Sequence, residues 1–131
     1  MKFIKDINKY YKQEVNLIDN IPLFIKSNNG LNIYITKYWY KNGKLHRGND
    51  KPAIEFPDGS KSWYKNGKRH RENDKPAIEY LSGTKVWYIN GKRHRENDKP
   101  AIEWSNGRKE WWINDNFIKL NFGKSLTKRK D

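Results

Sequence analysis

Apolar and polar residues follow one spacing in the first part of the chain and another in the rest. Over the first twenty residues, apolar side chains recur at spacings of three and four, which predicts one buried stripe of an amphipathic helix. Asp19, Asn20 and Pro22 are expected to end this helix. The segment from Leu23 to Lys41 is predicted to be a β-hairpin, and together the two elements would cap one end of the protein. The stripe consists of Phe3, Ile4, Ile7, Tyr10, Tyr11, Val15 and Ile18.

From residue 39 onward the pattern repeats with a period of 24 residues. The fourteen residues from Asn66 to Glu79 are identical to those from Asn90 to Glu103. The copy from Asn42 to Glu55 differs only at Leu45 and Gly48. A fixed period of this length predicts a repeat array, so residues that recur in every copy are explained first by architecture. Four tryptophans mark the period: Trp39, Trp63, Trp87 and Trp111.

Each repeat carries two turn signals. Asn-Gly is the first, because both residues tolerate the positive φ of a type I′ hairpin turn. A second set is Asp58–Gly59, Ser82–Gly83 and Asn106–Gly107. Pro52, Pro76 and Pro100 lack a ladder donor and therefore start a strand or lie outside one. One repeat is thus predicted to be two strands and two tight turns that continue as an antiparallel meander.

Two-residue turns would fix which side chains share a face. Around Asn66–Gly67, Tyr64 is placed opposite Arg69 and Trp63 opposite His70. Around Ser82–Gly83, Ile78 is placed opposite Trp87. One face would then carry Ile, Trp and His, and the other Ala, Tyr and Arg, with the Ile and Trp face buried. A one-residue bulge would exchange these faces.

The repeated segments WYKNGK and PDGSKSWYKNGK resemble the MORN repeat, and most closely its divergent forms in bacteria, phages and giant viruses. The likeness covers about Lys37 to Phe117. Arg47, Arg71 and Arg95 stand where the family usually has glycine, and KPAIE replaces its glycine-rich second strand. The resemblance implies an elongated β-meander used for protein contacts, assembly and sometimes lipid contact, without catalysis.

The expected fold is therefore mainly β, an antiparallel β-meander of 24-residue MORN-like hairpin repeats with an N-terminal amphipathic helix cap. We divide the chain into a helix and capping hairpin at 1–38, a repeat array at 39–118 and a basic tail at 119–131.

Charge narrows the expected partners. Lys and Arg outnumber Asp and Glu by 28 to 15, which gives a net charge of +13 spread along the whole chain. This balance favours anionic partners, although it is also typical of a lysine-rich soluble surface. The chain has no cysteine, which excludes a disulfide framework and fits a reducing compartment. No apolar run reaches the length of a membrane span, so we expect a cytoplasmic protein.

The repeat histidines are candidate metal ligands or bases, but spacing argues against both roles. Equivalent residues lie two strands apart, about 10 Å, which is too far for one zinc ion. A catalytic pair such as His70 with Asp74 would occur in three successive copies, and a catalytic constellation is seldom repeated intact in this way. We expect Asn73 and Asp74 to bond the backbone of their own turn. The expectation is that His46, His70 and His94 are structural, packed on tryptophan and bonded to the turn, with no metal, cofactor or catalytic residue.

The predicted partner-binding residues combine flat rings with guanidinium groups, which suits contact with anionic ligands. The alternative is internal, since cross-strand Tyr–Arg stacking and Arg–Glu pairs also stabilise a sheet. We expect a non-catalytic binding module for an acidic protein, by analogy a viral or phage host-interaction factor. The alternative is nucleic-acid binding; an anionic membrane is less favoured, and the open sheet edges allow a homodimer. The residues are Tyr64, Arg69, Arg71, Tyr88, Arg93 and Arg95.

Overall fold

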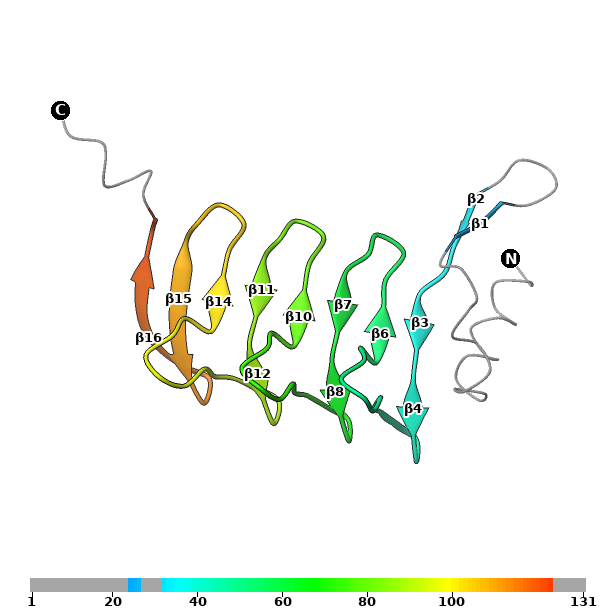
Figure 1. Ribbon diagram of the computed structural model, residues 1–131, viewed down its shortest axis with the longest axis horizontal. Helices are drawn as coiled ribbons and strands as arrows, with labels where there is room; N and C mark the ends of the chain where they lie inside the picture. Colours follow the sequence, from blue (N-terminus) through cyan, green and yellow to red (C-terminus); the bar gives the residue numbers. More distant parts are fainter. Residues whose placement is uncertain (1–23, 27–31, 124–131) are drawn as a thin grey trace.

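The computed structural model describes residues 24–26 and 32–123. Short strands lie side by side along the length of the molecule, joined by turns at both edges (Figure 1). β1 (Phe24–Lys26) pairs antiparallel with β2 (Asn32–Tyr34), so a hairpin occupies the first part of the predicted Leu23–Lys41 segment, whereas residues 37–41 pair with later segments. The turn of that hairpin, the N-terminal helix predicted over the first twenty residues and the basic cluster at 128–130 lie outside the described residues.

Eight strands form one antiparallel sheet. This arrangement confirms a mainly β protein built as a meander-like sheet of antiparallel hairpins. No helix that could cross a membrane occurs within the described ranges. In spatial order the strands are β16 (Asn116–Asn121), β15 (Lys109–Ile113), β14 (Ile102–Glu103), β11 (Lys85–Val86), β10 (Ile78–Glu79), β7 (Lys61–Ser62), β6 (Ile54–Glu55) and β3 (Lys37–Tyr38).

Each Asn-Gly turn closes a separate short hairpin. Asn66 and Gly67 both have positive φ, 51° and 84°, as a type I′ turn requires. Tyr64 pairs with Arg69 across this turn, which confirms the predicted register there. The three hairpins are β4 (Tyr40–Lys41) with β5 (Lys44–Leu45), β8 (Tyr64–Lys65) with β9 (Lys68–Arg69), and β12 (Tyr88–Ile89) with β13 (Lys92–Arg93).

The tryptophans separate these hairpins from the eight-stranded sheet. The backbone N–H of Trp63 donates to the carbonyl of Ala77 at 2.7 Å, and the equivalent bond joins Trp87 to Ala101. Ala77 and Ala101 are completely buried, and the indoles beside them are almost so. The strand pairing is therefore interrupted at Trp39, Trp63 and Trp87 instead of running on as one long ladder.

The register predicted at the second turn set is wrong by one residue. Ile78 pairs with Val86, and Trp87 is not its partner. The N–H of Tyr80 donates to the Thr84 carbonyl, and that of Gly83 donates to the Tyr80 carbonyl. Of the two turn residues only Gly83 has positive φ, at 97°. This is the three-residue loop with a glycine bulge, which adds one residue that a two-residue turn lacks.

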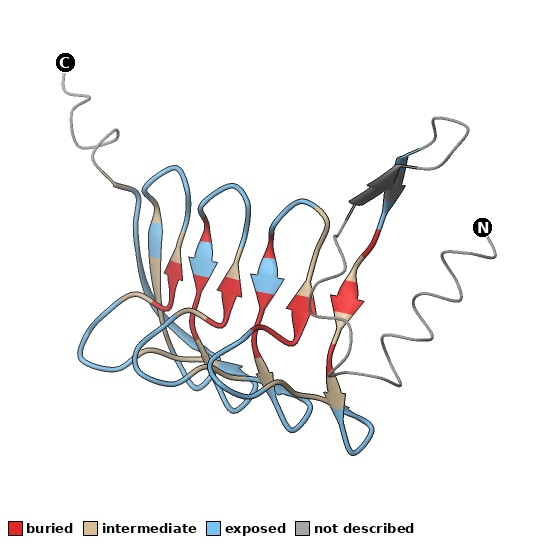
Figure 2. Cartoon of the chain, turned by 45° about the vertical axis from the view of Figure 1, so that its right-hand side comes forward, coloured by how far each residue is buried: buried red, intermediate tan, exposed pale blue. Residues whose placement is uncertain are grey.

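Because of the extra residue, the isoleucines and alanines lie on the faces opposite to those predicted relative to the tryptophans and tyrosines. Cross-strand partners share a face, so Ile78 lies with Val86, and the buried cluster of Ile78, Val86 and Ile102 packs against Tyr88. The predicted grouping of Ile with Trp, and of Ala with Tyr, is therefore incorrect. We call the side of Ile78, Val86 and Tyr88 the isoleucine face, and the opposite side, with Trp63 and Trp87, the tryptophan face. Buried residues lie along the middle of the sheet strands (Figure 2).

The last strand leaves one edge of the sheet open. β16 continues past residue 118, where the basic tail was expected to begin, and all its residues are exposed. Phe117, Ile118 and Leu120 keep between 38% and 54% of their surface accessible. Such an edge is a template for pairing with another chain.

Turn chemistry gives a first prediction. Gly67 has φ of 84°, and a Cβ placed there would only reach ordinary contact, 3.6 Å from the Lys44 side chain. Gly67→Ala should therefore lower the free energy of unfolding by about 1 kcal/mol, because of backbone strain and not collision. Gly48 has no positive φ and an empty surrounding. Gly48→Ala is the matched control and should leave stability unchanged or raise it. Urea unfolding followed by tryptophan fluorescence measures both; an equal effect of the two substitutions would contradict the strain argument.

Candidate binding surface

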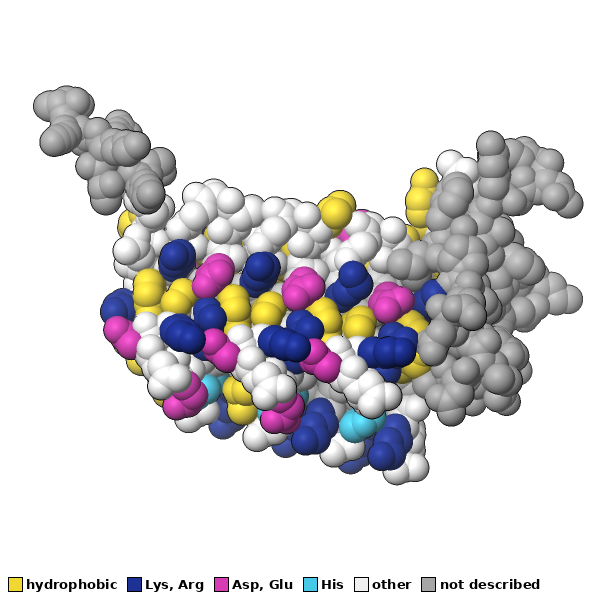
Figure 3. Space-filling model, viewed as in Figure 1, with side chains coloured by type: hydrophobic (Ala, Val, Ile, Leu, Met, Phe, Trp, Pro, Cys, Tyr) yellow, Lys and Arg dark blue, Asp and Glu magenta, His cyan; other side chains and the backbone are white. Residues whose placement is uncertain are grey.

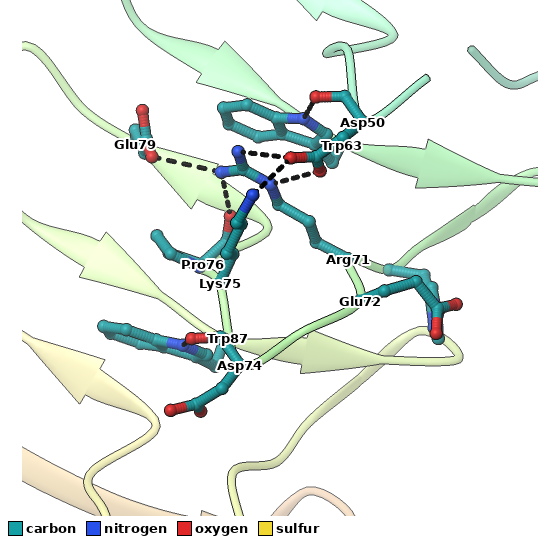
Figure 4. A network of polar contacts seen from close by, with 10 residues as sticks. Asp50, Trp63, Arg71, Glu72, Asp74, Lys75, Pro76, Glu79 and Trp87 are labelled. Atoms are coloured by element: carbon teal, nitrogen blue, oxygen red, sulfur yellow. Dashed lines mark hydrogen bonds and ion pairs between the residues drawn. The ribbon is translucent and has the colours of Figure 1, made fainter. Parts of the chain in front are cut away.

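Arginine, tryptophan and carboxylate side chains interlock on the tryptophan face. The Arg71 guanidinium lies 3.7 Å above the Trp63 ring. Its Nε donates to Asp50 Oδ1 at 2.9 Å and its Nη1 to Glu79 Oε2 at 3.1 Å. Nη1 also donates to the Pro76 carbonyl at 3.0 Å (Figure 4). Four acceptor or ring contacts thus fix one arginine, whose side chain is only 12% exposed.

This arrangement links successive repeats. Asp50 belongs to the repeat before Arg71, and its backbone carbonyl accepts a bond from Trp63 Nε1 at 3.0 Å. Lys75 Nζ donates to the same carboxylate at 2.8 Å. We call Asp50, Trp63, Arg71 and Lys75 the clasp. The clasp recurs one period later in Asp74, Trp87, Arg95 and Lys99.

The last copy of the clasp is weaker. Lys119 occupies the position of the arginine, and its Nζ lies 4.7 Å from the Trp111 ring centre. It reaches Asp98 at 3.5 Å, whereas the arginine–aspartate contacts are 2.8–2.9 Å. A lysine offers no planar fork for two carboxylate oxygens. The array is therefore less tightly joined at its C-terminal end.

The clasp changes the titration of its carboxylates. Hydrogen bonds from Arg71 and then Lys75 lower the pKa of Asp50 from 3.8 to about 2. Arg95 and Lys99 lower the pKa of Asp74 in the same way, also to about 2. Both carboxylates are about two-fifths exposed, so water and salt screen part of the interaction.

The repeat histidines bond to a turn, as predicted, but to the turn of the following repeat. The backbone N–H of Asn90 donates to His70 Nδ1 at 3.0 Å, and that of Asn66 donates to His46 Nδ1 at 3.0 Å. Nδ1 is therefore the acceptor, which leaves the proton on Nε2, and the Nε2 of His70 bonds to Glu72. No cluster of three or more potential metal ligands occurs in the part of the chain that the structure describes.

Asp74 does not bond its own turn, contrary to the prediction. Asn73 and Asp74 adopt left-handed backbone conformations, with φ of 61° and 56°. This conformation directs the Asp74 carbonyl to Trp87 and its carboxylate to Arg95 of the next repeat. The sequence showed a tight turn there but not which repeat it would contact.

Charged side chains of both signs alternate on the tryptophan face. A band of apolar side chains runs along it, with basic and acidic side chains alternating above and below (Figure 3). Glu79 lies between Lys61 and Lys85 in the strand register, and also bonds to Arg71. The basic side chains of the clasp on this face are therefore already paired with carboxylates.

The isoleucine face holds an arginine that has no carboxylate partner. The Arg69 guanidinium lies 5.6 Å from the Tyr64 ring centre and 5.5 Å from that of Tyr88. Within the described ranges no carboxylate is close enough to pair with it. Arg93, one repeat later, stacks on Trp112 at 3.8 Å and pairs with Asp115 at 3.0 Å.

The predicted binding residues therefore separate into two sets. Tyr64, Arg69, Tyr88 and Arg93 share the isoleucine face, as two cross-strand pairs. Arg71 and Arg95 lie on the tryptophan face, where the clasp holds them and leaves only 12% of each side chain exposed. The expectation that all six form one surface is not met, because Arg71 and Arg95 stack on tryptophans that alternate with the tyrosines.

The isoleucine face also carries a groove, beside Tyr88 and Arg93, that the sequence analysis did not predict. It has a volume of about 450 Å³ and lies on the isoleucine face of β10, β11 and β14. Its existence depends on the bulge register, which brings Ile78, Val86 and Ile102 together below three aromatic rings. The aromatic residues after each KPAIE segment were the available signal. The rings are Tyr80, Tyr88 and Trp104.

Comparisons with protein-family models, curated proteins and solved structures found no match for this chain.

Replacing one arginine on each face should show which arginine stabilises the fold and which is only exposed on the surface. Arg71→Ala should lower the free energy of unfolding by about 2–4 kcal/mol, because it uncovers the Trp63 ring and removes the arginine partner of the Pro76 carbonyl and of Glu79, while Asp50 keeps only Lys75. Arg69→Ala removes an exposed side chain and should change the free energy of unfolding by less than about 0.5 kcal/mol. Urea unfolding of the two variants measures the difference. Comparable losses would show that the clasp does not join the repeats.

Acid should weaken the clasp. A carboxylate whose folded pKa is lowered stabilises the protein above its unfolded pKa, and that contribution is lost as pH falls through the folded value. For Asp50 and Asp74 the window runs from pH 3.8 to about 2. Unfolding free energies measured at pH 5, 4, 3 and 2 should fall less steeply for Asp74→Asn than for the unchanged protein. Some slope should remain in the variant, since Glu72 and Asp115 also have lowered pKa values. Parallel curves would contradict the assignment.

Proposed function

We propose that this chain is a non-catalytic, MORN-like repeat module that binds an acidic protein through its isoleucine face. One observation carries the proposal: Arg69 is held between two tyrosine rings with no carboxylate partner among the described residues, whereas the arginines of the clasp are fully engaged. A cation placed between rings is positioned to pair with a partner's carboxylate without a large loss of side-chain freedom.

Lysines beside the Asn-Gly turns add a row of positive charge along the edge that these turns form, although Lys68 alternates with Arg69 along its strand and so points to the opposite side of the hairpin. Lys44, Lys68 and Lys92 begin the second strand of each short hairpin. Within the described ranges none of the three forms an ion pair. Hydrogen bonds between consecutive turns, from Gly67 N–H to the Leu45 carbonyl and from Gly91 N–H to the Arg69 carbonyl, hold the turns in a row. An acidic chain lying along this row would meet a cation at each repeat.

Poly-L-glutamate is a suitable probe for the proposed partner chemistry. The double variant Lys68→Gln with Arg69→Gln should bind labelled poly-L-glutamate about three- to tenfold more weakly than the unchanged protein in fluorescence polarisation, because two unpaired cations are lost. The matched control is Lys61→Gln with Lys85→Gln, which removes the same charge from the tryptophan face. All four side chains are exposed, so both variants should fold.

Equal weakening by both double variants would show that net charge alone drives binding and would contradict the proposed surface. Single-stranded RNA serves as the competing ligand in the same assay. Affinity for RNA well above that for poly-L-glutamate, falling linearly with the logarithm of salt concentration, would favour the nucleic-acid alternative instead.

A further inference from the structure

The groove on the isoleucine face has an apolar floor and an aromatic rim. Ile78, Val86 and Ile102 form the floor, and each is about 7% exposed. On the rim, Tyr80 and Trp104 keep 48% and 37% of their surface accessible. Concave apolar sites with aromatic walls are the usual form of ligand pockets. The volume of about 450 Å³ admits one bulky side chain together with the backbone beside it.

Polar groups around the groove already have partners. The Glu110 carboxylate accepts bonds from Trp104 Nε1 at 2.7 Å and from Trp112 Nε1 at 3.0 Å, and it pairs with Arg108. The Thr84 hydroxyl oxygen accepts a bond from the Ser105 N–H at 3.0 Å. Since these groups are satisfied, the groove offers mainly apolar and aromatic contact, and a polar occupant would gain little from it.

Tyr88 connects the groove to the unpaired arginine. Its ring lines the groove, and the same ring lies 5.5 Å from the Arg69 guanidinium. Arg93 also lines the groove and pairs with Tyr88 across the hairpin. Arg93 is paired with Asp115, so a ligand that buries a large side chain here has its neighbouring groups near Arg69 as the available cation. Apolar depth and a nearby cation therefore occur together at this groove.

We infer that the groove binds a large aromatic or aliphatic side chain of an acidic peptide segment, while a carboxylate next to that side chain pairs with Arg69. This inference rests on the proposed function and adds to it a requirement for one bulky apolar residue among the acidic ones. Charge complementarity selects the acidic segment, and burial of apolar area selects the side chain.

A glutamate–tyrosine copolymer and poly-L-glutamate of similar length test the requirement. The unchanged protein should bind the copolymer about tenfold more tightly, although the copolymer carries fewer charges, because each bound tyrosine removes apolar area from water. Tyr80→Ala should reduce this preference to near one, since it removes a rim ring without changing charge. Leu81→Ala is the matched control: Leu81 is 69% exposed, does not line the groove, and its loss should preserve the preference. Thermal unfolding of both variants confirms that they fold.

The outcomes separate this inference from the proposed function. Equal binding of the two polymers by the unchanged protein would overturn the groove inference and leave the acidic-partner proposal standing. A preference that persists in Tyr80→Ala, or that Leu81→Ala also removes, would overturn the groove as the site. If neither polymer binds the unchanged protein, both the groove inference and the proposed function are overturned.

Discussion

The clasp between repeats is the interaction on which the rest of the structure depends. The strands of each repeat in the sheet are only two residues long between β3 and β14, so backbone ladders alone give little cohesion. Arg71 compensates by stacking on Trp63 while bonding Asp50 of the preceding repeat and Glu79 of its own. Repeat proteins are stabilised by nearest-neighbour interfaces, and here the interface is largely a charged and aromatic contact.

The clasp pairs arginine with carboxylate on one face of the sheet only, so the two faces differ in how many of their arginines are paired. On the tryptophan face the basic side chains of the clasp are paired with carboxylates, so these basic residues contribute to holding the array together. Arg69 lies on the other side of the sheet beside two tyrosine rings, and in the part of the chain that the structure describes it pairs with no acid. The functional proposal follows from this division, since an unpaired, positioned cation is available to a ligand and a clasped one is not.

Local backbone chemistry could be predicted well where the turn residues have one strong preference. Asn66–Gly67 forms the type I′ turn that this dipeptide favours, and the pairing of Tyr64 with Arg69 followed directly. Ser82–Gly83 is ambiguous, because serine does not favour positive φ and the glycine alone fits a bulged loop. A single inserted residue there moved Ile78 and Ala77 to faces opposite to those predicted, and with them the position of the groove.

The 24-residue period by itself determined that the protein is a β-hairpin array, where its turns lie, and that the histidines serve the turns, since periodicity and turn propensity are local properties. Only the tertiary structure decided which arginines remain available. Arg69 and Arg71 are two residues apart, yet one stacks between tyrosines and the other is clasped to the preceding repeat. That difference depends on contacts between residues more than twenty positions apart, such as Arg71 with Asp50, and no local pattern encodes them.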